Sequence, residues 1–222
     1  ALLGAKVGDT VSYRLVLSGT PSATTTPVIN IFSMGTTSMS GSGTTWTYST
    51  TSASAWTSGF VTFYMAWGGS AGEATTTISQ TSLTSANVEF DKTAPTISSI
   101  TSSATASGVL KVGDTITFTL ATSSTERYGS VSGSYNSQSL TWSLSGVSTF
   151  TSTYTVAEGE TDRTSALQIS SVLLTDAAGN ASSAGAGSDI AKTIDANSPS
   201  LPAASPAAGT FFSASQSITL SS

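Results

Sequence analysis

Short runs in which apolar and hydroxyl side chains alternate recur along the whole chain. In the segment 115–120, Ile116, Phe118 and Leu120 alternate with threonines, which is the period-two pattern of a strand with one buried face. Further strands are predicted at Thr96–Thr101, Leu140–Leu144, Phe150–Val156, Leu167–Ile169, Val172–Leu174 and Ala191–Ile194, with turns at Gly133, Gly146, Gly159 and Asp176–Asn180. About seven strands in about one hundred residues predict an immunoglobulin-like β-sandwich.

The first ninety residues show the same alternation. Strands are predicted at Val11–Leu17, Val28–Phe32, Trp46–Tyr48, Val61–Trp67 and Thr75–Ile78. The stretch between Met34 and Thr57 is rich in Ser, Thr and Gly, and we expect it to be an exposed connection of low complexity.

Two markers show that these halves are copies of one module. The pentapeptide Lys-Val-Gly-Asp-Thr occurs at Lys6–Thr10 and again 105 residues later at Lys111–Thr115. The pattern Asp-x-x-x-Pro occurs at Asp91–Pro95 and again 104 residues later at Asp195–Pro199. Repeats of this length are whole domains rather than solenoid units.

The markers divide the chain into three predicted modules. Residues 1–91 form a module that lacks its first strand, 92–195 form a complete module, and 196–222 begin a third, with Ser217–Leu220 as its first clear strand. No signal peptide opens the chain, and we expect the 222 residues to be an excerpt of a longer precursor.

Composition supports an all-β fold and excludes some classes of binding partner. Ser and Thr supply more than a third of the residues, and charged residues only 9%, a balance that favours strands and turns over helices. The net charge is −5 and no basic patch is present, so nucleic acid is not expected as a partner. No apolar run is long enough for a transmembrane helix.

The chain contains neither histidine nor cysteine. The commonest general base and the thiolate metal ligands are therefore both missing, and a serine nucleophile would lack its base. We expect no catalytic residues and no enzyme activity. Asp9 and Asp114 precede the corresponding strands of the two copies, where an aspartate serves a turn more naturally than catalysis.

Several segments resemble a known family. Asp91–Ile97 followed by Lys111–Phe118 is similar to the tandem bacterial Ig-like domains of large adhesins, S-layer proteins and other cell-surface proteins, as are Tyr154–Asp162 and Leu174–Asn180. Segments Pro206–Phe212 and Gln216–Ser222 resemble the start of a chitobiase C-terminal-type Ig-like domain.

The resemblance implies an extracellular, non-catalytic structural protein of the bacterial cell surface, such as a stalk, an S-layer element or a filament component. Its expected partners are neighbouring copies of itself or other surface proteins. The alternatives are an adhesin or carbohydrate-binding module that contacts glycans, and an accessory region of a polysaccharide-degrading enzyme. Trp56 lies in a polar stretch and is the one tryptophan expected to be exposed for sugar stacking, whereas Trp67 and Trp142 are expected in cores.

Calcium is the cofactor expected from the acidic residues. In the family, acids near module junctions sometimes bind Ca²⁺, and the matching positions here are Asp91, Asp176, Asn180 and Asp195. The loop acids Glu158, Glu160 and Asp162 form a second candidate site, because Ca²⁺ takes several carboxylate and carbonyl oxygens from a turning chain. Turn chemistry and a solvated loop are the alternatives for these two sets, and the first copy's corresponding turn, 69–73, carries no aspartate.

Overall fold

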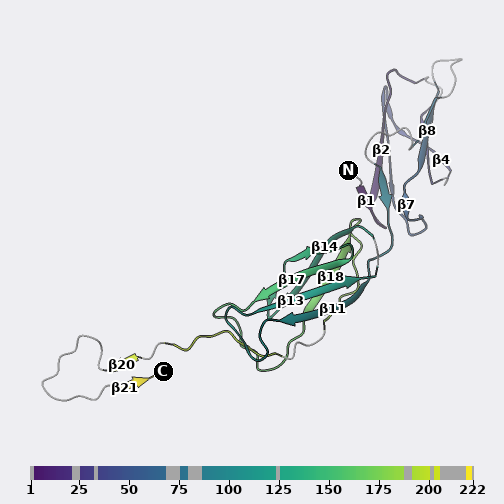
Figure 1. Ribbon diagram of the computed structural model, residues 1–222. Helices are drawn as coiled ribbons and strands as arrows, with labels where there is room; N and C mark the ends of the chain where they lie inside the picture. The colour runs from purple at the N-terminus through teal and green to yellow at the C-terminus, as the bar shows by residue number, and fades with distance from the viewer. Residues whose placement is uncertain are drawn as a thin grey trace. The chain divides into compact units, whose positions relative to one another are not determined.

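The computed structural model of this chain describes residues 3–21, 26–32, 35–68, 76–79, 87–123, 126–187, 192–200, 203–205 and 219–221. These residues form strands and no helix (Figure 1), and the predicted all-β, immunoglobulin-like sandwich class is confirmed. The chain divides into two compact units, one of residues 1–98, 122–131 and 173–184 and the other of residues 99–121, 132–172 and 185–222. The module boundaries predicted at 91 and 195 stay a prediction.

The first unit contains the sheets of the first copy. One sheet has the order β2 (Thr10–Val16), β6 (Thr45–Thr51), β5 (Ser40–Ser42); a second has the order β4 (Thr36–Ser38), β3 (Val28–Ile31), β8 (Phe63–Trp67), β9 (Thr76–Ser79); a third has the order β1 (Leu3–Ala5), β10 (Val88–Phe90), β7 (Gly59–Phe60). The rings of Tyr13 in β2 and Phe63 in β8 meet edge to face with centroids 5.1 Å apart. The first two sheets therefore pack across one apolar core.

Trp56 is part of that core, so the expectation that it is exposed was wrong. Its side chain is only 4% exposed, and its ring lies 5.0 Å from Phe32 and 5.5 Å from Phe90 between centroids. The polar neighbours of Trp56 in sequence gave no sign of this, because a turn at residues 54–56 carries the indole inward. Trp67 and Trp142 are both half-buried.

Most described residues of the stretch between Met34 and Thr57 are exposed, as expected, but the stretch is not a connection. It contains β4, β5 and β6, and β6 pairs with β2 over seven residues, from Thr10 opposite Thr51 to Val16 opposite Thr45. Met39, between β4 and β5, is buried. Serine and threonine on the solvent face of a strand give the same local composition as a loop, which explains the error.

The second unit is built on the strands of the complete copy, whose ends at residues 97–98, 122, 128–131 and 173–176 belong to the first unit. One sheet has the order β11 (Ile97–Ala104), β13 (Thr115–Thr122), β17 (Thr149–Thr155), β16 (Trp142–Leu144); another has the order β15 (Gln138–Ser139), β14 (Tyr128–Tyr135), β18 (Ser170–Asp176); and β12 (Leu110–Lys111) pairs with β19 (Ile194–Asp195). Figure 1 shows β11, β13 and β17 side by side. Tyr135 connects the layers, since its ring lies 5.1 Å from both Phe118 and Tyr154.

Two details of this copy differ from the sequence prediction. Gly133 lies inside β14 rather than at a turn, and a Cβ there would come within 3.1 Å of the Val172 side chain. Of the two predicted strands Leu167–Ile169 and Val172–Leu174, only the second is a strand, within β18, which starts after the buried Ile169. A glycine that permits close approach of two strands has the same local signature as a turn glycine.

The two Lys-Val-Gly-Asp-Thr segments have the same local structure. In each, the aspartate Oδ2 accepts the backbone N–H of the lysine three residues earlier, at 2.9 Å from Lys6 to Asp9 and 2.9 Å from Lys111 to Asp114. Gly8 has φ of 94° and Gly113 has φ of 91°, a region that favours glycine. Both aspartates therefore serve the turn that opens a strand, as their positions in the sequence predicted.

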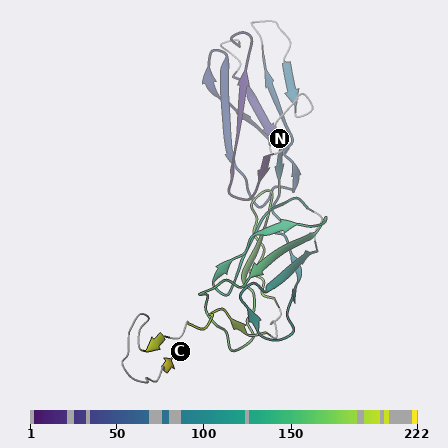
Figure 2. The same cartoon turned by 60° about the vertical axis from the view of Figure 1, so that its left-hand side comes forward.

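The end of the chain carries one described hairpin, in which β20 (Ala203–Ser205) pairs with β21 (Thr219–Ser221) (Figures 1 and 2). Residues 217 and 218 of the strand predicted there, and the turn at 69–73, lie outside the described residues. The described part of the chain contains no helix that is long and apolar enough to span a membrane.

Candidate metal centre

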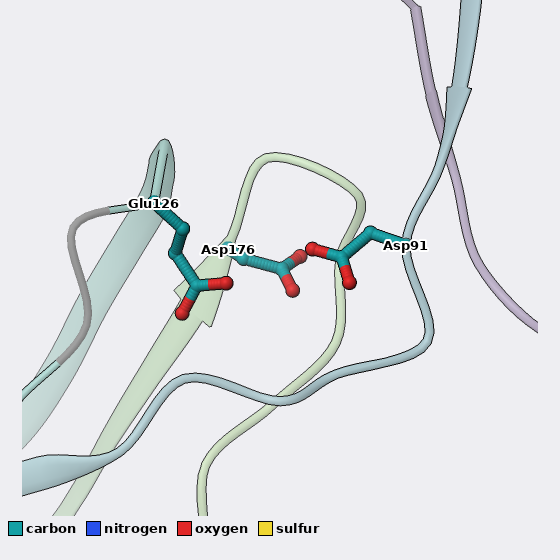
Figure 3. Close-up of side chains that lie close together, drawn as sticks. All are labelled: Asp91, Glu126 and Asp176. Carbon is teal, nitrogen blue, oxygen red and sulfur yellow. The ribbon is translucent and has the colours of Figure 1, made fainter. Parts of the chain in front are cut away.

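Three carboxylates from distant parts of the sequence meet in the first unit. Asp91, Glu126 and Asp176 each bring one carboxylate oxygen to within 4.8 Å of the others, and Figure 3 shows the three groups facing one another. In a chain with only twelve acidic residues, such a concentration of negative charge is costly unless a cation offsets it. Among the described residues it is the one group of three acidic or metal-binding side chains this close.

Asp91 is held where β10 ends and the chain continues toward Pro95. Its Oδ1 accepts the backbone N–H of Thr93 at 2.9 Å, which is the local turn that aspartate favours. Its own N–H donates to the carbonyl of Ala5 at 2.8 Å, so the backbone is fixed beside β1.

Asp176 is held by the turn that follows β18. Its Oδ1 accepts the backbone N–H groups of Ala178 at 2.8 Å and Asn180 at 2.9 Å, and its Oδ2 accepts the Asn180 side-chain amide at 2.8 Å. The same Asn180 amide nitrogen donates to the carbonyl oxygen of Asp91 at 3.0 Å. Asn180 therefore ties two of the clustered residues together and fixes the orientation of the Asp176 carboxylate.

Glu126 is the member of the cluster that the sequence prediction missed. It lies just before β14, in a segment without a recognisable motif. Its negative charge was the one feature of the sequence that could have marked it as a metal ligand. Its Oε1 is buried and has no hydrogen-bond partner among the described residues. A buried carboxylate oxygen without a donor is costly, and a cation at the cluster would remove that cost.

The donor set suits a hard cation. Carboxylate and carbonyl oxygens are the ligands that Ca²⁺ prefers, in a flexible arrangement of six to eight, and the three carboxylates would supply the charged part of it. The nearby cation Lys6 donates from its Nζ to the carbonyl of Gly179 at 2.8 Å. Of the first predicted set, the structure thus brings Asp91, Asp176 and Asn180 together.

Asp195, the fourth member of that set, belongs to the second unit and is not one of the three clustered carboxylates. It is the last residue of β19, whereas Asp91 follows β10, and its Oδ1 accepts the backbone N–H of Asn197 at 3.4 Å. The described residues around it contain no pair of acids that completes a group of three. The same turn aspartate therefore has a different surrounding in each copy.

Glu158, Glu160 and Asp162 point to different partners. Glu158 accepts the backbone N–H and the hydroxyl of Ser198 at 2.8 and 2.7 Å. Asp162 Oδ1 accepts the backbone N–H of Ala196 and the side-chain amide of Asn197, both at 2.8 Å. Two of the three acids thus hold the segment that leaves β19. The calcium prediction for this loop stays a prediction.

Glu160 belongs to a buried polar network. The Tyr154 hydroxyl donates to Glu160 Oε2, and the buried Asn136 donates to the Tyr154 oxygen and accepts the Arg163 Nε–H at 2.7 Å. Burial, and then the hydrogen bond to Glu160, raise the pKa of Tyr154 to about 12. At the exposed Glu158, the hydrogen bonds from Ser198 lower the pKa of the carboxyl below its ordinary value.

Comparison with known proteins adds little to this geometry. No protein-family model matches the chain, and no curated protein matches it in sequence. Among solved structures, the chain is similar to the fibronectin(III)-like modules of CbhA from Clostridium thermocellum, with a TM-score of 0.43 and 13% sequence identity over 89% of this chain and 90% of that one.

Proposed function

We propose that this chain is a non-catalytic structural part of an extracellular bacterial surface protein, a stalk, S-layer or filament element, whose modules are stiffened by Ca²⁺. The carboxylate cluster of Asp91, Glu126 and Asp176 carries the proposal. It brings three of the chain's twelve acids together at the start of the segment that leaves β10. An ion bound there would fix this segment to the turn at 176–180.

Stiffness would follow from the chemistry of the segment. Residues 91–95 end in a proline, whose fixed φ already limits bending. A cation that bridges Asp91 and Asp176 would add a second constraint, since both carboxylates would have to release it before the segment could rotate. A buried apolar core under a hydroxyl-rich surface would keep each module folded within such a stalk.

The absence of histidine and cysteine from the sequence supports a non-catalytic role. Asp9 and Asp114, the two acids that could be imagined as catalytic, accept backbone N–H groups of their own turns. A carboxylate whose oxygen accepts a backbone N–H of its own turn in this way supports architecture.

The alternative function, glycan binding, was expected to depend on Trp56 as an exposed aromatic residue. A sugar platform needs an exposed aromatic ring, and Trp56 lies in the core. Specific binding on a glycan array by the intact chain would favour the adhesin or accessory alternatives instead. A chain that binds no glycan and is stabilised by Ca²⁺ favours the structural role.

Calcium binding is tested by titration calorimetry and by thermal unfolding with Ca²⁺ or with a chelator. A ligand that binds only the folded state stabilises it by about 2.7 kcal/mol at a hundredfold excess over its dissociation constant. We expect Ca²⁺ to raise the melting temperature and Glu126→Gln to abolish most of that shift. Unfolding that is the same with Ca²⁺ and with chelator would refute the calcium part of the proposal.

Two matched controls are available within the chain. Asp195→Asn changes the counterpart of Asp91 outside the cluster, and Glu158→Gln changes an acid held by serine instead of by other acids. Both should leave the calcium shift intact, whereas Asp91→Asn and Glu126→Gln should remove it. If all four variants lose the shift equally, the ion binds elsewhere.

A further inference from the structure

The segment by which the chain leaves the second unit, residues 194–198, is held on two sides; we call it the exit segment. On one side β19 pairs in parallel with β12. On the other side lie residues 157–163, the latch loop, where Arg163 and Ile194 exchange two backbone hydrogen bonds at 2.8 Å each. Ile194 and Ala196 are 2% and 0% exposed, so the exit segment is part of the folded unit.

Two carboxylates of the latch loop extend this grip beyond the backbone pairing. Asp162 Oδ1 accepts the backbone N–H of Ala196 and the side-chain amide of Asn197, both at 2.8 Å. Glu158 accepts the backbone N–H of Ser198 at 2.8 Å and its hydroxyl at 2.7 Å. Hydrogen bonds to an ionised acceptor are shorter and stronger than neutral ones. The last three residues of the exit segment are therefore all held by charge.

The latch loop is itself fixed to the core. Glu160, between the two carboxylates, accepts the Tyr154 hydroxyl. The buried Asn136 donates to the carbonyl of Thr161 at 3.1 Å and accepts the Arg163 Nε–H at 2.7 Å. A buried network whose members all have partners makes the loop rigid, so Glu158 and Asp162 hold the exit segment from a fixed base.

The first copy has the same backbone arrangement with different side chains. The pairings of Thr10 with Thr51 and of Thr115 with Thr155 align the loops that follow. The counterparts of Glu158, Glu160 and Asp162 are then Ser54, Trp56 and Ser58.

Ser58 has the same partner as Asp162 but a weaker bond to it. Lys92, the counterpart of Ala196, donates its backbone N–H to the Ser58 hydroxyl oxygen at 3.3 Å, against 2.8 Å from Ala196 to Asp162. Two serines thus occupy the positions of the two carboxylates, and the charge of the latch belongs to the second copy.

We propose that the latch loop resists the tension that acts on the second unit when the chain is stretched, and that Glu158 and Asp162 set its strength. This rests on the structural function proposed above. It does not depend on the calcium site, because the bonds form between groups of the chain itself. Since β12 and β19 are parallel, tension on the two ends of the chain draws them in opposite directions along their length. The bonds of the exit segment are then loaded together and must break before Ile194 can leave the core.

Single-molecule stretching of the intact chain tests the proposal. The chain contains no cysteine, so Thr93→Cys and Ser200→Cys, at two exposed positions, provide attachment points on either side of the second copy. Unfolding at constant force, in the presence of a chelator, reports a rate rather than an equilibrium. We expect the pair Glu158→Ser and Asp162→Ser, which copies the residues of the first copy, to unfold about tenfold faster, equivalent to about 1.4 kcal/mol. An unchanged rate would overturn the proposal.

Ile169→Val is the matched control, because it weakens the same unit away from the exit segment. Ile169 is 1% exposed, and the loss of one buried methyl group should lower the midpoint of denaturant unfolding about as much as the serine pair does. Under force, however, the control should unfold at close to the wild-type rate. A control that unfolds under force as fast as the serine pair would mean that the rate follows stability alone, and it would refute the role of the latch.

Hydrogen exchange of single backbone amides checks the bonds without force. Asp162→Ser should speed exchange at Ala196, and the reciprocal change Ser58→Asp in the first copy should slow exchange at Lys92. No change at either amide would overturn the proposal.

Neither experiment involves the carboxylate cluster, so the latch and the calcium site can fail separately. Loss of the calcium-dependent rise in melting temperature would refute the calcium part of the proposed function and leave the stretching result unchanged. Equal forced unfolding of the wild type and the serine pair would refute the latch and leave the calcium result unchanged.

Discussion

The two copies share a strand entry and differ in what covers the strand that follows. Asp9 and Asp114 hold their turns with the same hydrogen bond at the same length, yet β13 has β11 as a neighbour in its sheet, whereas no described strand pairs with the corresponding edge of β2. Sequence similarity around the turn therefore does not predict whether a neighbouring strand pairs with the other edge of the strand that follows. A local motif fixes the local backbone, whereas coverage depends on a segment that is not part of the motif.

The largest expected effect comes from proline placed on that far side. Thr117→Pro removes an N–H that faces β11 and leaves its acceptor unpaired, which should destabilise the second unit by about 2–3 kcal/mol. Its counterpart Ser12→Pro should cost less than about 1 kcal/mol, because no described residue pairs with that N–H. Denaturant unfolding of both variants makes the comparison. Equal losses would mean that β2 is covered after all.

Alanine at the turn glycines should have a smaller and equal effect in the two copies. Gly8→Ala and Gly113→Ala each place a Cβ on a backbone with φ near +90°, where a side chain costs about 1–2 kcal/mol. No atom lies within 4 Å of that Cβ in either copy, so the cost is conformational only. Melting temperatures measure it, and a difference between the two variants larger than their error would show that the turns are not equivalent.

The next smaller loss of stability is expected from removing the carboxylates of the two turns. Asp9→Ala and Asp114→Ala each delete the acceptor of one backbone N–H, with an expected cost of about 1 kcal/mol in free energy of unfolding. Asp→Asn at the same positions keeps an acceptor and should cost less. If Asp9→Ala instead abolished a ligand-binding or hydrolytic activity without loss of stability, the structural role assigned to it would fall.

The smallest expected effect is acid sensitivity of the segment that follows β19. In the second copy, Glu158 accepts hydrogen bonds from Ser198, which follows β19. The residue of the first copy that corresponds to Glu158 is Ser54, and its backbone carbonyl accepts a hydrogen bond from the Lys92 ammonium at 3.1 Å. The hydrogen bonds from Ser198 lower the pKa of Glu158. Its contribution to stability is therefore present above the ordinary glutamate pKa of about 4.3 and is lost as the pH falls through the lowered value.

Hydrogen exchange of the backbone amides of residues 196–198 checks this effect. It is measured between about pH 6 and about pH 3, because that range brackets the titration of a glutamate. We expect protection to fall with pH in the wild type and to be low and constant in Glu158→Gln. Protection that stays high at low pH would show that Asp162 and Gly159 hold the segment without Glu158.

Much of the fold was predictable because its signal is local. Alternation in Thr115–Leu120 predicted β13, and the Gly-Asp pair predicted the turn before it. The prediction failed at Gly133, at Trp56 and between Met34 and Thr57. In each case a local composition typical of turns or loops also occurs on strands or in cores, and only packing against another segment separates the alternatives.

The candidate site was half predictable for the same reason. Asp91 and Asp176 belong to turn motifs that could be read in the sequence, whereas Glu126 belongs to no motif and enters the cluster only through the fold. Glu158, Glu160 and Asp162 show the opposite case. They are spaced by two in the sequence, yet the chain directs them to Ser198, to Tyr154 and to Asn197.

By itself the sequence determined the all-β class, the duplication and the turn that opens each strand, since these depend on side-chain period and on backbone preferences within a few residues. Only the tertiary structure decided which acids share a site and which strand lies beside β13. Both depend on the distance between separate segments of the chain, here residues 91, 126 and 176 in one case and strands β11 and β13 in the other. No local pattern encodes such a distance, because it is set by how the sheets pack.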